Sequence, residues 1–295
     1  MSQPPRFDVE VERAIPFGTA FVNFNEGAGP FRDRPLLLDV YKPTGLEQPA
    51  PALIMAFGGA FHRGTREDDR RPEETPVNTN IADYCARFAA RGYVCFSIDY
   101  RLTQEDSHPG FTPTMGPEPV PTSRIDVVRK ILGLPPATSD MLKRSQEGAI
   151  DDIVTAYRFV SGEARALGVD PARIGVGGFS AGGRIAVTAA LAEAISPAAV
   201  VALSGVAAPS IVDRFHASGK RRMPVFLAYG EHDLDYVIPG VEAMVARFDA
   251  AAHPYQCCRL PGQSHFYEAG AEVVATLGQP ESLEAAIEQF LAEHL

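Results

Sequence analysis

The pentapeptide Gly178-Phe179-Ser180-Ala181-Gly182 is the part of the chain whose residue types most directly indicate chemistry. It lies between an apolar run suited to a strand, RIGVG, and a stretch suited to a helix, RIAVTAALAEA. A G-x-S-x-G sequence in that setting forms a sharp strand-to-helix turn that lifts the serine hydroxyl clear of a sheet. Small flanking residues are needed because larger side chains would clash in such a turn. Ser180 is therefore the predicted nucleophile, and the alternative is a glycine-rich helix start that only packs tightly or binds a phosphate.

Two loops downstream of Ser180 carry groups that could activate it. A serine hydroxyl needs a base to remove its proton and a third group to hold that base in the correct tautomer. After the apolar run VFLAY comes Gly-Glu-His-Asp-Leu-Asp, which makes Asp233 the predicted acid, ahead of Asp235 and then Glu231. After the next apolar run comes Pro-Gly-Gln-Ser-His, which makes His265 the predicted base. The alternatives are a helix-capping carboxylate for Asp233 and an exposed loop histidine for His265.

The sequence FGGAF, directly after the apolar run ALIMAF, is a candidate oxyanion hole. Attack of a serine on a carbonyl creates an oxyanion, which backbone amides from two loops commonly stabilise. Gly58, Gly59 and Ala60 are small enough to let their amides face a substrate oxygen, and Gly59 and Ala60 are the expected donors. The amide of Ala181, next to the nucleophile, is the expected second contribution. The alternative for this loop is a plain glycine turn.

The elements that must position these loops follow from the hydrophobic pattern. Short apolar runs alternate with helical periodicity, which predicts a mostly parallel central sheet with helices on both faces. Three early runs without helices between them predict an antiparallel beginning, and they are 7–13, 20–25 and 36–41. The expected buried strands are 52–57, 94–99, 173–176, 199–203, 225–229 and 256–260. Apolar stripes predict helices around 81–88, 150–157, 241–248 and 283–291.

Residues 103–148 interrupt this alternation with seven prolines and a short helix expected near 125–131. So long a connection within a compact domain usually has a function, and its position after a strand places it above the carboxyl edge of the sheet. We therefore expect a single domain, 1–295, with 103–148 as an inserted cap or lid; the alternative is a surface excursion. The residues expected to contact the substrate are Phe61, His62, Phe179, Phe111 and Met115.

Composition excludes several classes of partner. With 27 Lys and Arg against 37 Asp and Glu, the net charge of −10 repels nucleic-acid phosphates and anionic membrane surfaces and favours neutral substrates. The apolar stretch 198–208 is shorter than the roughly 20 residues that cross a bilayer. No metal or cofactor is expected, since His232 and Asp233 are adjacent rather than spaced to face one ion. The first residues contain no apolar signal region, so we expect a cytoplasmic protein, or a secreted one if a signal peptide has been removed.

Motifs in a fixed order extend over most of the chain: LLLDVYKP, FGGAFHRG, SIDYRL, LGVDPARIGVGGFSAGG, YGEHD and GQSHF. In them the chain resembles the α/β-hydrolase superfamily, specifically bacterial carboxylesterases near the hormone-sensitive-lipase-like and feruloyl-esterase-like (BD-FAE) groups. The resemblance implies a Ser180, Asp233 and His265 triad, with an oxyanion hole from 58–60 and Ala181. One departure is that the usual HGGG reads FGGA here, which would narrow or rigidify the acyl side of the hole.

The leading hypothesis is a serine carboxylic-ester hydrolase that forms an acyl-enzyme with neutral, short-chain acyl esters. The expected partner is a small-molecule ester, without nucleic acid or membrane, and a homodimer is left open. One alternative is an amide-bond hydrolase of the formamidase or peptidase type, which would use the same three residues. Another is a non-catalytic binding protein on the same fold, although such proteins normally lack one member of the triad. The natural ester, its stereochemistry and the oligomeric state do not follow from the sequence.

Overall fold

The apolar runs form one central sheet in the computed structural model, which describes residues 6–24, 30–71, 77–107, 114–275 and 281–295. The strands are β1 (Val9–Val22), β2 (Arg32–Pro43), β3 (Ala50–Ala56), β4 (Val94–Ile98), β5 (Val169–Phe179), β6 (Val200–Leu203), β7 (Val225–His232), β8 (Tyr255–Ser264), β9 (Glu272–Ala275) and β10 (Glu281–Ser282). Their spatial order is β1-β2-β4-β3-β5-β6-β7-β8-β9-β10. The pairs from β4 through β3 to β8 are parallel, and the pairs at both ends of the sheet are antiparallel. The predicted mostly parallel sheet is confirmed.

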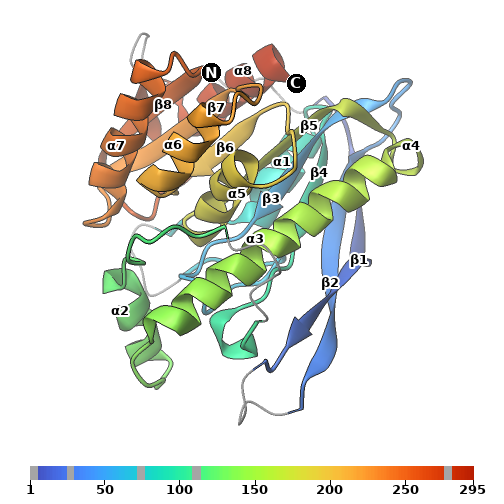
Figure 1. Cartoon of the computed structure of the whole chain (residues 1–295). Coiled ribbons are helices and arrows are strands. Elements are labelled where there is room, and N and C mark those ends of the chain that lie inside the picture. Colours follow the sequence, from blue (N-terminus) through green and yellow to red (C-terminus); the bar gives the residue numbers. More distant parts are fainter. Residues whose placement is uncertain (1–5, 25–29, 72–76, 108–113, 276–280) are drawn as a thin grey trace.

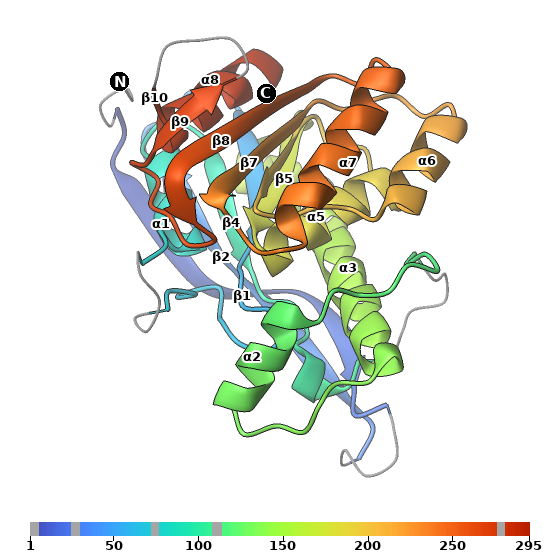
Figure 2. The same ribbon diagram turned by 90° about the vertical axis from the view of Figure 1, so that its left-hand side faces the viewer.

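Helices cover both faces of this sheet, as expected (Figure 1 and Figure 2). They are α1 (Ile81–Ala89), α2 (Ser123–Ile131), α3 (Ser139–Gly162), α4 (Ala164–Leu167), α5 (Ala181–Ala192), α6 (Pro209–Ala217), α7 (Val237–Ala250) and α8 (Leu283–His294), with a 3₁₀ turn, η1 (Thr103–Glu105). Figure 2 shows α1 and α8 on one side of the sheet and α3, α5, α6 and α7 on the other. Strands β4 and β6, covered on both sides, consist entirely of buried residues, which explains their continuous apolar sequences.

The first two apolar runs are a single strand rather than two. Residues 7–13 and 20–25 were expected to be separate, but β1 continues between them and pairs with β2 throughout. Its register shifts between Glu12 and Ile15 and again between Pro16 and Gly18, and Ala14 has a φ of 58°. These two irregularities accommodate the extra residues between the apolar runs, so the strand bends but continues.

The segment 103–148 contains η1, α2 and the beginning of α3. Helix α2 confirms the short helix expected near 125–131. Helix α3, expected from about Ile150, already begins at Ser139, where the Thr138 hydroxyl accepts a hydrogen bond from the Met141 amide at 3.2 Å. The last ten residues of the segment are therefore the first turns of a helix that continues onto the sheet.

A small apolar cluster joins this segment to the loop after β3. Ile125 and Val128 of α2 and Leu142 of α3 are buried together with Ala60. Figure 2 shows α2 beyond the edge of the sheet, next to the start of α3. The long connection thus packs over one of the loops predicted to carry chemistry. In the described ranges, no helix has both the length and the apolar character that a membrane span requires.

Candidate active site

Ser180 occupies a sharp turn between β5 and α5. Its backbone has φ 54° and ψ −114°, a conformation that side-chain-bearing residues rarely adopt, and its amide donates to the Leu203 carbonyl at 2.7 Å. The flanking glycines are required by close backbone approach. A Cβ on Gly178 would lie 2.4 Å from the carbonyl oxygen of Ala56, and one on Gly182 would lie 2.0 Å from the same oxygen. This close approach is the physical reason for glycine at both positions of the motif.

A chain of hydrogen bonds joins three residues from the carboxyl ends of β5, β7 and β8. Ser180 Oγ lies 2.8 Å from His265 Nε2, and His265 Nδ1 lies 2.6 Å from Asp233 Oδ1. The side chain of His265 is 4% exposed and that of Asp233 is fully buried. The structure thus brings together the three residues chosen from the sequence, in the order that lets an imidazole take a proton from a hydroxyl while a carboxylate holds its other nitrogen.

Asp233 is held by several donors, whereas Asp235 lies elsewhere. The Oδ2 atom of Asp233 accepts from the Ser204 hydroxyl at 2.6 Å and from the Gly230 amide at 3.0 Å. Asp235 instead accepts from the Ser123 hydroxyl of α2 at 2.8 Å, at an exposed position. Glu231, the third candidate, accepts from the Gly262 amide at 2.7 Å. Of the three carboxylates left open by the sequence, Asp233 is the one in contact with His265.

Ser204 is a residue that the sequence reasoning missed. It follows β6 at the same edge of the sheet, has a φ of 48°, and its hydroxyl also lies 2.8 Å from the Tyr267 hydroxyl. The only available signal was its place after a buried strand, because its partner Asp233 is 29 residues away.

Replacing Ser204 by alanine should lower the free energy of unfolding by about 1.5–3 kcal/mol, because a buried carboxylate loses a hydrogen-bond donor. Urea unfolding curves measure this change. The matched control is Ser123→Ala, which removes the exposed hydrogen bond to Asp235 and should cost less than about 0.5 kcal/mol. Equal losses in the two variants would contradict the importance of the Ser204 contact.

The loop after β3 turns sharply beside Ser180. Gly59, Ala60 and Phe61 have φ values of 132°, 54° and 61°. The Gly58 amide donates to Asp69 Oδ2 at 2.8 Å, so it is already bonded, whereas the amides of Gly59 and Ala60 donate to no described residue. Ala181 is the first residue of α5, where an amide has no acceptor within its helix. Among the described residues, the amides of Gly59, Ala60 and Ala181 thus have no acceptor, whereas the fourth amide expected to bind an oxyanion, that of Gly58, has one.

The buried carboxylate of Asp69 holds this loop in place. This carboxylate accepts from the Gly58 amide and, at 3.1 Å, from the Ile81 amide at the start of α1. Burial raises the pKa of Asp69 to about 6, although both amide bonds act against the shift. The sequence gives no local sign of this role, because both partners are more than ten residues away.

His62 supports the same turn. It is buried, its Nδ1 lies 2.6 Å from the Ala60 carbonyl oxygen, and its Nε2 lies 2.9 Å from Arg129 Nη1 of α2. Since a guanidinium only donates, Nε2 accepts and Nδ1–H donates to Ala60. Burial lowers the pKa of His62, which agrees with a neutral ring.

A pocket of about 420 Å³, including its open mouth, lies beside Ser180. Its lining comes from the loop after β3, the segment 103–148, α3, α5, the loop after β6 and the start of α7. The lining residues are Ala60, Phe61, Val120, Pro121, Ile125, Gln146, Ser180, Ala181, Arg184, Ser204, Gly205, Val206 and Tyr236.

The residues expected to contact the substrate divide into those at the pocket and those away from it. Phe61 lines the pocket, whereas His62, Met115 and Phe179 do not. The Phe179 ring packs against the imidazole of His265 with centroids 5.3 Å apart, and the Met115 amide donates to Glu147 at 2.6 Å. Phe111 lies outside the described residues. In the part of the chain that the structure describes, no three His, Cys, Asp or Glu side chains gather in a way that could hold a metal ion.

Two family models and several solved structures match this chain. Residues 137–265 match the family model described as Phospholipase/Carboxylesterase, and residues 38–112 match the BD-FAE model. The fold matches that of esterase Est2 from the planctomycete Thermogutta terrifontis with a TM-score of 0.53 at 17% identity, covering 88% of this chain and 83% of that one. The chain has the α/β-hydrolase fold.

The fold of this chain also matches that of esterase B from Lactobacillus Rhamnosis, with a TM-score of 0.51 at 18% identity, covering 88% of this chain and 77% of that one. The Thermogutta terrifontis esterase has in addition been solved phosphonylated by cyclosarin. No curated protein matches the chain. Sequence identities this low establish the fold alone, and the match to the Phospholipase/Carboxylesterase model is what supports ester hydrolysis.

Proposed function

We propose that the protein is a serine carboxylesterase that cleaves short-chain acyl esters through an acyl-enzyme. The observation that carries this proposal is the unbroken hydrogen-bonded path from Ser180 through His265 to Asp233. Ser180, the first residue of this path, lines a pocket beside the amides of Ala60 and Ala181, which is the arrangement that acyl transfer requires.

In this mechanism Ser180 Oγ attacks the ester carbonyl carbon while His265 Nε2 takes the hydroxyl proton. Asp233 stabilises the resulting imidazolium, and the amides of Gly59, Ala60 and Ala181 stabilise the oxyanion. Collapse of the tetrahedral intermediate expels the alcohol, which receives the proton from His265. Water, activated by the same imidazole, then cleaves the Ser180 ester and releases the acid.

The pocket is the basis for the proposed preference for short acyl chains. Val120, Pro121 and Ile125 of the segment 103–148 form part of its wall, which supports a cap role for this connection. The Thermogutta terrifontis esterase has been solved with propionate and with butyrate bound. We propose that acyl groups of this size fit here, with Phe61 among their contacts.

A series of p-nitrophenyl esters from acetate to palmitate, with a p-nitroanilide for comparison, tests the proposal. We expect kcat/KM to be highest at two to four carbons and to fall with longer chains, because Val120, Pro121 and Ile125 form part of the pocket wall. Faster cleavage of the anilide would assign the site to amide hydrolysis. A long-chain optimum would contradict the confined pocket, and failure of the folded protein to cleave any of these esters would contradict the esterase.

A further inference from the structure

The pocket contains polar side chains that ester cleavage does not use, and Arg184 and Gln146 are two of them. Arg184 lies on α5, one helical turn after Ser180, and its amide donates to the Ser180 carbonyl at 2.9 Å. Its Nε donates to Oε1 of Gln146, from α3, at 2.9 Å. Because a guanidinium has no acceptor, this bond identifies the oxygen of the Gln146 amide and leaves its NH₂ group directed elsewhere.

That NH₂ group has no acceptor. Gln146 is 2% exposed, and its Nε2 atom is buried without a hydrogen-bond partner among the described residues. A buried donor left unsatisfied costs free energy, so native structures seldom retain one that has no purpose. Gln146 lines the pocket, so we take this unpaired donor as a contact for an acceptor from outside the chain.

The Nη atoms of the half-buried Arg184 are also unpaired, although they are not buried as Gln146 Nε2 is. Within the described ranges its Nη atoms have no hydrogen-bond partner, and it forms no salt bridge. Glu118 acts on it only through space, since that carboxylate is bonded to the amide and hydroxyl of Ser210 at 2.9 and 2.7 Å. Burial lowers the pKa of Arg184, the effect expected of a desolvated cation without a paired anion.

We propose that the pocket binds a carboxylate carried by the ester substrate itself, with Arg184 and Gln146 Nε2 as donors. A carboxylate presents two oxygens in a plane, which suits the planar fork of a guanidinium. Tyr236, whose hydroxyl has no partner among the described residues, lines the same pocket and supplies a third donor. The inference rests on the proposed esterase function and replaces the neutral substrate expected from the net charge.

The position of Arg184 limits the size of such a substrate. Residues one helical turn apart have Cβ atoms about 5–6 Å apart, so the carboxylate lies within a few bonds of the scissile ester. This separation fits the half-ester of a short dicarboxylic acid, or a short acyl ester of a hydroxy acid. The surface charge of −10 is screened beyond about 8–10 Å at physiological salt, whereas a guanidinium inside the pocket acts at contact distance.

Matched pairs of substrates test this directly. Monoethyl glutarate is compared with diethyl glutarate for a carboxylate on the acyl side, and butyryloxyacetate with its methyl ester for a carboxylate on the alcohol side. In at least one pair we expect kcat/KM to be about 10- to 100-fold higher for the acid, the size expected for hydrogen bonds to a charged group. Preference for the uncharged ester in both pairs would overturn the proposal.

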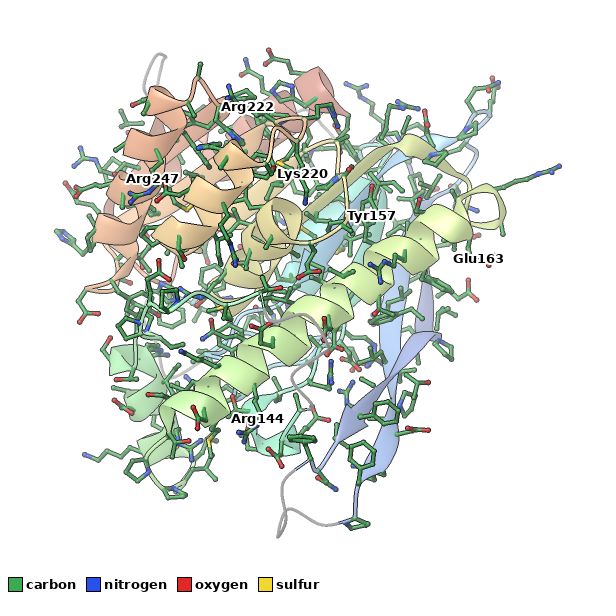
Figure 3. The ribbon with its side chains drawn as sticks, in the orientation of Figure 1. Arg144, Tyr157, Glu163, Lys220, Arg222 and Arg247 are labelled. Carbon is green, nitrogen blue, oxygen red and sulfur yellow. The ribbon has the colours of Figure 1, made fainter. Side chains whose placement is uncertain are left out.

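The Arg184→Met variant should abolish this preference, so that the ratio of kcat/KM for acid and uncharged ester falls to about one or below. The matched control is Arg222→Gln, which removes the same charge from an exposed position (Figure 3). Arg222 precedes β7, whereas Ser180 lies at the carboxyl edge of the parallel strands. The ratio in Arg222→Gln should equal that of the wild type. An unchanged ratio in Arg184→Met, or an equal fall in both variants, would overturn the role of Arg184.

A binding measurement separates this inference from the esterase proposal. Calorimetric titration of the Ser180→Ala variant with monoethyl glutarate and with butyryloxyacetate reports binding without turnover. Binding of an acid that is lost on adding Arg184→Met supports the inference even if no ester is cleaved. Cleavage of uncharged esters together with no detectable binding of either acid would overturn the inference and leave the esterase intact.

Discussion

Replacing Ser180 by alanine should lower kcat for p-nitrophenyl butyrate by roughly 10⁶-fold, because the attacking oxygen is removed while the rest of the site remains. The hydroxyl lies 2.8 Å from His265 Nε2, and no second hydroxyl is bonded to that nitrogen in the described residues. Some acceleration over water should persist through the backbone amides and substrate binding. Steady-state rates, with circular dichroism and melting temperature to show an unchanged fold, provide the measurement.

The control for Ser180→Ala is Ser123→Ala, which removes a hydroxyl from α2 and should retain turnover. An organophosphonate that labels reactive serines should modify wild-type protein once per chain and leave Ser180→Ala unmodified. Activity of Ser180→Ala above about one per cent of wild type would remove this residue from the role of nucleophile.

The second large effect concerns the acid. Asp233→Asn should lower kcat by about 10⁴-fold, since an amide in place of the carboxylate can hold His265 in the wrong tautomer and cannot stabilise its charged form. Asp233 Oδ1 lies 2.6 Å from His265 Nδ1, and three further donors hold the carboxylate in position. The substitution therefore removes the negative charge beside His265.

Asp235→Asn is the matched substitution, two residues along the same loop, and should change kcat by less than tenfold. Its carboxylate is bonded to the Ser123 hydroxyl at an exposed position and does not contact His265. The kcat values of both variants on one ester decide the assignment. A greater loss in Asp235→Asn than in Asp233→Asn would move the role of the acid to Asp235.

The sequence by itself predicted those parts of the site whose geometry is local. Gly178 and Gly182 mark a turn in which any Cβ would meet the Ala56 carbonyl, so the pattern reports the backbone around Ser180 directly. The alternation of apolar runs likewise predicted the parallel strands whose carboxyl ends meet at one edge of the sheet. Short loops after two of those strands then brought Asp233 and His265 to the serine.

Only the tertiary structure decided which side chains surround these three. Asp233 and Asp235 have the same chemistry in one loop, and the choice between them depends on donors supplied from other strands and from α2. His62 and Phe179 are each adjacent in the chain to a residue that lines the pocket, but neither of them lines it. Arg184 and Gln146 carry no recognisable motif, and they meet because α3 packs against α5 across 38 residues of sequence. Local patterns encode backbone turns, whereas the direction of a side chain and its partners depend on how distant elements pack.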